Sequence, residues 1–374
     1  MKLDRIEDAI TAIAAGEIVV VVDDDDRENE GDLIMAAAAA TPEKVAFMIR
    51  HTSGILCAPL TAANAQRLRL DPMVSANDAP LATAFTVSVD YRFGLTTGIS
   101  AEERCNTVRA LANDNAGSGD FVRPGHVFPL VAREGGVLMR TGHTEAAVDL
   151  ARLAGLPQVG LLAELVNDDG TMQRGAQVAD FARAHSLRII SVADIVAHRQ
   201  RREQLVERIA EFAVQTRIGA ARGIVYSTPF DDIHHLALVF GDISASPKDG
   251  VITRLHRENV VEDVFGRSAM LDIALDRIAA AGQGVLVYLR EGGAGVPAMG
   301  WDQSSRTDTA PASAGEGAQS EAIRQEEWRD IGLGAQILRD LGLASIRLIT
   351  NRERHFIALA GFGIKIATTD LVQD

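Results

Sequence analysis

The pattern of hydrophobic and polar positions predicts short helices and strands over the first 200 or so residues. Ile6, Ile10 and Ile13 follow the spacing of one helical face, and Gly16 is a suitable helix end. The apolar segment EIVVVV, residues 17–22, is typical of a buried strand. The same reasoning predicts helices at residues 144–155 and 176–186, and strands at 159–166 and 188–192. Such a mixture favours an α/β or α+β domain.

Two predicted helices carry clear start signals. Thr41 is a suitable N-cap, and Pro42 follows it at the first helical position, where the missing N–H costs nothing. Ser100 and Glu103 have the spacing of a capping box at the start of SAEERCNTVRALAND.

The pattern changes after residue 190. Residues 191–212 form a charged stretch with helical character, which we interpret as the domain junction. Strand and helix patterns resume beyond it, at residues 223–227, 234–242, 268–282, 284–289, 330–342 and 345–350. Residues 292–320 are rich in Gly, Ala, Ser and Pro without periodicity, and we expect a mobile loop there. We therefore expect two domains, residues 1–203 and residues 204–374.

Composition and charge narrow the class of protein. The 374 residues are 47% hydrophobic and 24% charged, as in an ordinary globular protein. A net charge of −14 disfavours nucleic acid and anionic membrane surfaces as partners. The N-terminus lacks the apolar stretch of a signal peptide, and no apolar run approaches membrane-spanning length, so we expect a cytoplasmic protein. Cys57 and Cys105 are the only cysteines, which supports neither a disulfide framework nor a structural zinc site.

An acidic run follows the first predicted strand. Seven carboxylates lie within residues 23–32, and in an extended chain Glu28, Glu30 and Asp32 would face the same way. Several hard oxygens on one edge suit Mg²⁺ or Mn²⁺. The alternative is a solvated acidic turn, and we expect residues 23–26 to remain in solvent in either case.

Three further segments could carry chemistry. His126, in RPGHVFPL, is either a structural histidine or a catalytic one. Arg140, Gly142, His143 and Thr144 lie where a loop enters a helix, which suits a phosphate group but equally an ordinary capped helix.

Glu164 lies in the apolar segment LLAELV. A buried carboxylate there would suit general acid or base chemistry. The alternative is an outward-facing side chain on a half-exposed strand.

Six segments in this order resemble the 3,4-dihydroxy-2-butanone 4-phosphate synthase family of riboflavin biosynthesis. They are DDDDRENEGDLIMAA, HTSGILCAPLT, FTVSVD with GLTTGISAEER, RPGHVFPL, GGVLMRTGHTEAAVDLARLAG and AELVNDDGTM. The resemblance implies a mixed α/β sandwich over residues 1–203. It also implies a lyase that uses a divalent metal to convert ribulose 5-phosphate into 3,4-dihydroxy-2-butanone 4-phosphate and formate.

The same resemblance implies roles for particular residues. Glu28 and His143 would bind Mg²⁺ or Mn²⁺, and His126, Glu164 and Asp32 would be catalytic. The first general base stays open among Glu28, Asp32, His126 and Glu164. The implied substrate-binding residues are Arg27, Glu28, Asp32, Arg140, Thr141, Gly142, His143, Thr144 and Glu164. Homodimers with the active site near the subunit interface are also implied. Cys57 would lie near the site, although its apolar surroundings equally fit a small buried hydrophobe.

The second half resembles GTP cyclohydrolase II, with an α/β domain over residues 204–374. That family binds zinc through three cysteines. Here Asn259 stands in the first place, and the short stretch with the other two is missing after DVFG. REGGAGV departs from the family's QEGRGIG, whereas Arg329 is kept and Glu327 replaces the usual Asp. We therefore expect no zinc, no GTP cyclohydrolase activity, and a structural or regulatory second domain. The alternative is a bifunctional enzyme that retains GTP cyclohydrolase II activity.

Overall fold

A computed structural model describes most of the chain, and its described residues form two compact units. They are residues 3–23, 30–79, 81–229, 233–244, 249–266, 269–290, 332–350 and 364–372. Among these described residues, the first unit extends to His198 and the second begins at Arg199. The loop expected at residues 292–320 lies outside the described residues.

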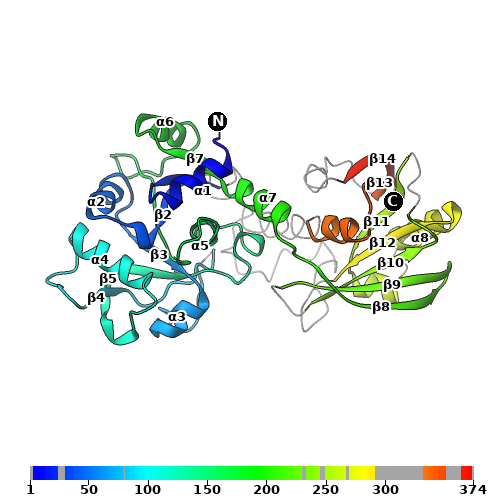
Figure 1. The fold of residues 1–374 in the computed structure, drawn as a ribbon, viewed down its shortest axis with the longest axis horizontal. Helices are drawn as coiled ribbons and strands as arrows, with labels where there is room; N and C mark the ends of the chain where they lie inside the picture. Colours follow the sequence, from blue (N-terminus) through cyan, green and yellow to red (C-terminus); the bar gives the residue numbers. More distant parts are fainter. Residues whose placement is uncertain are drawn as a thin grey trace, which may run out of the picture. The chain divides into compact units, whose positions relative to one another are not determined.

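The first unit is built on a seven-stranded mixed sheet with the order β4-β5-β3-β6-β2-β1-β7. Figure 1 labels β2, β3, β4, β5 and β7 of this sheet. β1 pairs with β2 in antiparallel fashion and with β7 in parallel. β6 lies antiparallel between β2 and β3. The strands are β1 (Val19–Val22), β2 (Gly31–Ala36), β3 (Cys57–Leu60), β4 (Val89–Tyr91), β5 (Phe121–Val131), β6 (Gly160–Glu164) and β7 (Arg188–Ser191).

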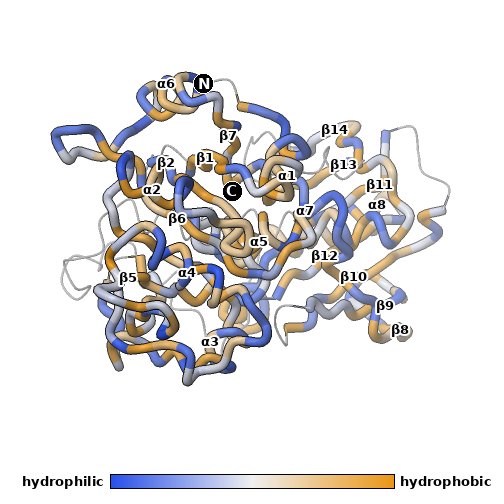
Figure 2. The backbone as a smooth tube through the Cα atoms, turned by 60° about the vertical axis from the view of Figure 1, so that its left-hand side comes forward, coloured by the Kyte–Doolittle hydropathy of each residue, from blue (hydrophilic) through white to orange (hydrophobic). Residues whose placement is uncertain are grey.

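Helices cover both faces of this sheet and bury two separate apolar clusters. On one face α2 (Pro42–His51), α3 (Ala62–Leu68), α4 (Ala101–Leu111) and α6 (Ala176–Ala184) pack on side chains such as Val20 and Leu33. On the other face α1 (Ile6–Ala14), α5 (His143–Leu153) and α7 (Val192–Arg202) pack on side chains such as Val21 and Ile34. Figure 2 shows β1 as a continuous hydrophobic segment, whereas α4 and α6 alternate between hydrophobic and hydrophilic residues. Strands covered on both faces therefore have no polar side, which explains the run of four valines.

The helix start signals are confirmed. Thr41 accepts a hydrogen bond from the backbone N–H of Lys44, and Pro42 is the first residue of α2. Ser100 accepts one from the backbone N–H of Glu103 at the start of α4. The Glu103 carboxylate, however, binds the hydroxyl of Ser100 and both the N–H and the hydroxyl of Thr96. It therefore holds a neighbouring loop as well as the helix start.

Gly125 allows β4 and β5 to approach closely. A Cβ at Gly125 would lie under 3.0 Å from the backbone of Val89 and Asp90. We expect Gly125→Ala to lower the free energy of unfolding by about 1–3 kcal/mol, because backbone atoms cannot move aside as a flexible side chain can. Urea unfolding followed by circular dichroism measures this loss. Gly119→Ala is the matched control, since a Cβ at that position would meet nothing within 4 Å. Equal unfolding midpoints for the two variants would contradict the expectation.

The second unit contains a seven-stranded sheet with the order β14-β13-β11-β12-β10-β9-β8. β8, β9, β10 and β12 pair in antiparallel fashion, and β12, β11, β13 and β14 in parallel. Helix α8 (Ala269–Ala281) packs on the sheet, and residues 332–340 are also helical. The strands are β8 (Glu207–Thr216), β9 (Gly219–Ser227), β10 (His234–Phe240), β11 (Val251–Arg257), β12 (Gly284–Leu289), β13 (Ser345–Thr350) and β14 (Lys365–Leu371).

The expectation of a helical stretch up to residue 212 is wrong for its second part. The helix α7 ends at Arg202, and residues from Glu207 onward belong to strand β8. β8 is an edge strand whose side chains are almost all exposed. It therefore has no buried face that would give an alternating pattern in the sequence. The expected two-domain α/β architecture is confirmed, and no helix among the described residues is both long and apolar enough to cross a membrane.

Candidate active site

Two carboxylates and an imidazole meet in the middle of the first sheet. Asp32, near the start of β2, is the register partner of Glu164 at the end of β6. His143 begins α5, and its Nδ1 lies 3.7 Å from Oδ1 of Asp32. Asp32 and His143 are buried, whereas Glu164 is half-buried. The fold thus brings together three residues that are far apart in the sequence.

Glu164 is held by the loop before β3. The hydroxyl of Ser53 donates to Oε2 of Glu164 over 3.0 Å, and the backbone N–H of Ser53 donates to its carbonyl over 2.9 Å. Glu164 is the last residue of its strand rather than a residue in its middle. This position lets the carboxylate reach a polar partner without the cost of burial in the apolar core.

Cys57 lies beside the two carboxylates but is not set up as a nucleophile. Burial raises the pKa of its thiol, and the charges of Glu164 and Asp32 raise it further. The thiol therefore stays protonated at neutral pH, and a protonated thiol is a poor nucleophile and metal ligand.

The acidic run is only partly described. Arg27 and Glu28 lie outside the described residues. Asp23 is buried and its carboxylate accepts the backbone N–H of Glu30, so the expectation that it is solvated is wrong. Glu30 pairs with Arg174 at 3.1 Å, whereas Asp32 faces His143. Glu30 and Asp32 therefore have different partners.

The loop at residues 140–144 enters α5, as the sequence predicts, with Gly142 at the N-cap. The guanidinium of Arg140 donates to the buried carboxylate of Glu145 over 2.7 Å. It also contacts the carbonyl of Leu81 and the hydroxyl of Thr83. Its orientation is therefore fixed by groups on two sides, and the helix N-terminus lies next to it.

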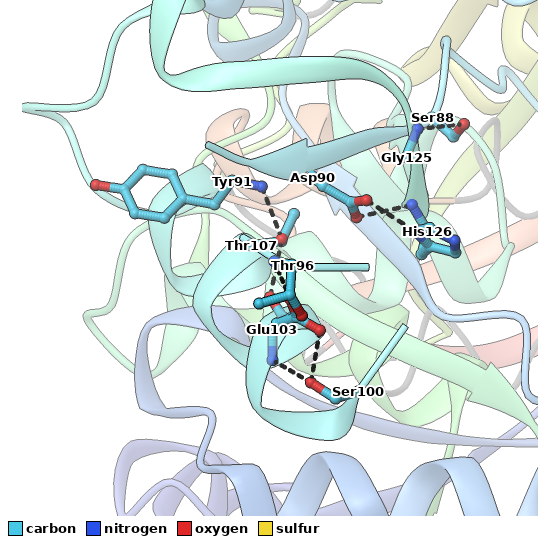
Figure 3. A network of polar contacts seen from close by, with 9 residues as sticks. All are labelled: Ser88, Asp90, Tyr91, Thr96, Ser100, Glu103, Thr107, Gly125 and His126. Carbon is cyan, nitrogen blue, oxygen red and sulfur yellow. Dashed lines mark hydrogen bonds and ion pairs between the residues drawn. The ribbon is translucent and has the colours of Figure 1, made fainter. Parts of the chain in front are cut away.

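His126 lies on β5 and contacts a different carboxylate. Its Nδ1 is 2.7 Å from Oδ2 of Asp90, and its backbone N–H donates to Oδ1 over 2.8 Å (Figure 3). Sequence reasoning assigned no role to Asp90, Ser53 or Glu145. Ser53 and Asp90 stand in segments that resemble the synthase family, but no spacing rule connects them to Glu164 or His126.

The donor atoms around His143 are of the kinds that bind a hard divalent cation. An imidazole nitrogen and carboxylate oxygens suit Mg²⁺ or Mn²⁺. Among the residues that the structure describes, no group of three His, Cys, Asp or Glu side chains is arranged to hold a metal. Mg²⁺ usually keeps several water ligands and takes only one or two from the protein. A pair of protein ligands that includes Glu28, outside the described residues, is compatible with that preference.

The fold, together with the cluster of Asp32, Glu164 and His143, is that of a two-unit α/β enzyme. Comparisons with known proteins identify its family. Residues 7–198 match the model of 3,4-dihydroxy-2-butanone 4-phosphate synthase, and residues 207–370 match that of GTP cyclohydrolase II. The chain belongs to the 3,4-dihydroxy-2-butanone 4-phosphate synthase family, fused to a domain of the GTP cyclohydrolase II family. The expected class of enzyme is thereby confirmed.

Curated relatives match along almost the whole chain. Riboflavin biosynthesis protein RibBA of Rhodococcus erythropolis is 47% identical over 380 residues, which cover 98% of this chain and 88% of that protein. The RibBA protein of Mycobacterium tuberculosis is 46% identical, with the same coverage.

Solved structures share the fold. RibBX of A. baumannii, described as a two-domain 3,4-dihydroxy-2-butanone 4-phosphate synthase, is 36% identical with a TM-score of 0.80 and covers 99% of this chain and all of that one. A 3,4-dihydroxy-2-butanone 4-phosphate synthase in complex with two magnesium ions is 46% identical with a TM-score of 0.52. It covers 54% of this chain and 98% of that one.

The expectation that the second domain lacks GTP cyclohydrolase activity is contradicted. The GTP cyclohydrolase II model matches residues 207–370, and RibBA relatives span both domains. These findings favour the alternative of a bifunctional enzyme. The expectation relied on a few zinc-ligand positions, whereas the domain match depends on the sequence of the whole second unit.

Proposed function

We propose that the first unit converts ribulose 5-phosphate into 3,4-dihydroxy-2-butanone 4-phosphate and formate in riboflavin biosynthesis. The observation that carries this proposal is the cluster of Asp32, Glu164 and His143, with the Arg140 loop leading directly into the helix that bears His143. Formate release from ribulose 5-phosphate by the purified protein tests it. An absence of formate under metal-replete conditions would contradict it.

The substrate has a phosphate and several hydroxyl groups, and the site offers partners for both. We assign the phosphate to residues 140–144, where a helix N-terminus and a guanidinium favour an anion. A guanidinium has five N–H donors, so the contacts of Arg140 with Glu145, Leu81 and Thr83 leave donors for phosphate oxygens. Asp32 and Glu164, together with Arg27 and Glu28, are assigned to the sugar.

The reaction requires proton transfer next to the ketone, rearrangement of the carbon skeleton, and loss of one carbon as formate. Glu164 and His126 are assigned to proton transfer, with Asp32, and the first base stays open among these three and Glu28. When bound, Mg²⁺ or Mn²⁺, held by Glu28 and His143, would supply Lewis-acid stabilisation of developing negative charge on oxygen. Burial of Asp32 and His143 lowers the local dielectric response and strengthens such charge interactions.

We expect Arg140→Ala to raise KM for ribulose 5-phosphate by roughly 10- to 150-fold. Hydrogen bonds to a charged group contribute about 1.5–3 kcal/mol, and each 1.4 kcal/mol is a factor of ten. Steady-state kinetics of formate release gives both kcat and KM. Arg183→Ala is a suitable control, because Arg183 is an exposed residue of α6 whose ion-pair partner is the exposed Asp180. An unchanged KM for Arg140→Ala would remove Arg140 from the phosphate site.

Assembly and location remain predictions from the sequence and the family resemblance. We propose a homodimer with the active site near the subunit interface, in the cytoplasm. Analytical ultracentrifugation tests the dimer.

A second candidate activity is favoured by the comparisons for residues 207–370. We propose that the second unit acts as a GTP cyclohydrolase II, because it matches that family model and belongs to a chain with full-length RibBA relatives. Both cysteines lie in the first unit, so the second unit has no thiolate of its own to hold a metal. Formate release from GTP by the full chain, with added divalent metals, supports the assignment. Its absence with every metal would overturn it.

A further inference from the structure

We propose that Asp90 is a positioning residue, which holds the imidazole of His126 in the orientation and tautomer needed for proton transfer. This inference rests on the proposed synthase function of the first unit. It assigns a role to a buried carboxylate that lies outside the cluster of Asp32, Glu164 and His143.

Both carboxylate oxygens of Asp90 contact His126. Oδ1 accepts the backbone N–H of His126, and Oδ2 lies 2.7 Å from its Nδ1. Because a carboxylate that is ionised only accepts hydrogen bonds, we assign the hydrogen of this contact to Nδ1. The lone pair of a neutral imidazole is then on Nε2. The Asp90 side chain is only 4% exposed whereas that of His126 is 40% exposed, so the contact is buried on the carboxylate side and open on the ring side.

A tightly held loop covers this contact. Gly98 has a φ of +85°, and a Cβ there would lie under 3.0 Å from Oδ2 of Asp90 and 2.6 Å from Nδ1 of His126. Figure 3 shows the anchor of this loop, the Glu103 carboxylate, bound to Thr96 and Ser100. These hydrogen bonds lower the pKa of Glu103 to about 2, so the anchor is ionised at neutral pH. The backbone at Gly98 therefore lies directly against the Asp90–His126 contact, on a loop that Glu103 anchors.

Arg104 is influenced by the charge of Asp90 and contacts the loop that holds Glu164. Arg104 is buried; burial lowers the pKa of its guanidinium, and the charge of Asp90 opposes that shift. The same guanidinium donates to the carbonyl of Gly54 over 3.2 Å. Gly54 follows Ser53, which binds Glu164. The segment that contains Ser53 and Gly54 thus contacts both Arg104 and Glu164.

A purely structural role for Asp90, as a link between β4 and β5, is the competing explanation. Ser88 supplies the control, because its hydroxyl accepts the backbone N–H of Gly125 and so links the same segments without contact to the ring. We expect Asp90→Asn to lower kcat about 10²–10⁴-fold with little change in KM, because an amide also offers a donor and releases the ring from one tautomer. Asp90→Glu should recover part of the rate, and Ser88→Ala should keep kcat.

A spectroscopic measurement separates positioning from stability. In protein labelled with ¹⁵N-histidine, His126→Asn identifies the signals of this ring. We expect the Nδ1–H tautomer in wild type and in Ser88→Ala, and a mixture or the Nε2–H tautomer in Asp90→Asn. An Nε2–H tautomer in the wild-type protein would overturn the inference without any variant. Wild-type kcat in Asp90→Asn, combined with an inactive His126→Ala, would overturn it while leaving the proposed function intact. If the wild type released no formate, the proposed function would fail, and the tautomer would still decide whether Asp90 positions the ring.

Discussion

Glu164→Gln is expected to lower formate release from ribulose 5-phosphate by about 10²–10⁴-fold, the usual contribution of a positioned acid or base. The amide has the shape of the carboxylate and can still accept the hydroxyl of Ser53, but it cannot carry a proton between substrate atoms. The protein should therefore fold normally while kcat falls.

Two comparisons make this result specific. Glu17→Gln changes an exposed carboxylate just before β1 and should leave kcat unchanged. Ser53→Ala removes the hydroxyl that orients Glu164 and should produce a smaller loss than Glu164→Gln. A Glu164→Gln enzyme with wild-type turnover would show that the carboxylate binds or positions at most, and that the proton moves elsewhere.

Removal of divalent metal is expected to reduce synthase turnover by at least about 10²-fold, because Lewis-acid stabilisation is typically several kcal/mol and 1.4 kcal/mol is a factor of ten. Dialysis against EDTA followed by the formate assay measures the loss. Addition of Mg²⁺ or Mn²⁺ should restore the rate, and EDTA already saturated with Mg²⁺ should have no effect.

Metal binding also has a readout that does not depend on turnover. A ligand at about 100 times its Kd stabilises the folded protein by about 2.7 kcal/mol, so Mg²⁺ or Mn²⁺ should raise the melting temperature of the wild type. His143→Ala should lose most of that increase, since it removes one of the two proposed ligands. Full activity after exhaustive EDTA treatment would contradict the metal assignment, as would an equal thermal shift in wild type and His143→Ala.

Local signals in the sequence predicted much of the first unit. The valines of β1, Thr41 with Pro42, and Ser100 at the start of α4 each depend on neighbours within one turn or one strand. Such short-range preferences are read directly from the order of residues. The segments containing Glu164 and His143 were also placed on the right kinds of element.

Pairings between distant segments could not be predicted in this way. His126 and Asp90 are 36 residues apart, and their contact exists only because β4 and β5 are adjacent. The contact between Ser53 and Glu164 spans 111 residues. Strand β8 was missed for a related reason. It is a strand because it pairs with β9, and it has no buried face that would give an alternating sequence pattern. The prediction that the second domain lacks GTP cyclohydrolase activity was wrong because it relied on three zinc-ligand positions. The family match depends on the sequence of the whole domain.

The protonated, buried thiol of Cys57 has a consequence for the sensitivity of the site to oxidation. Burial and the negative charges of Glu164 and Asp32 raise the pKa of its thiol and keep it in the neutral form. Peroxides and alkylating reagents attack the anionic form of sulfur, and they reach buried sulfur slowly. The Cys57 thiol should therefore react slowly with peroxides and alkylating reagents for as long as the protein stays folded.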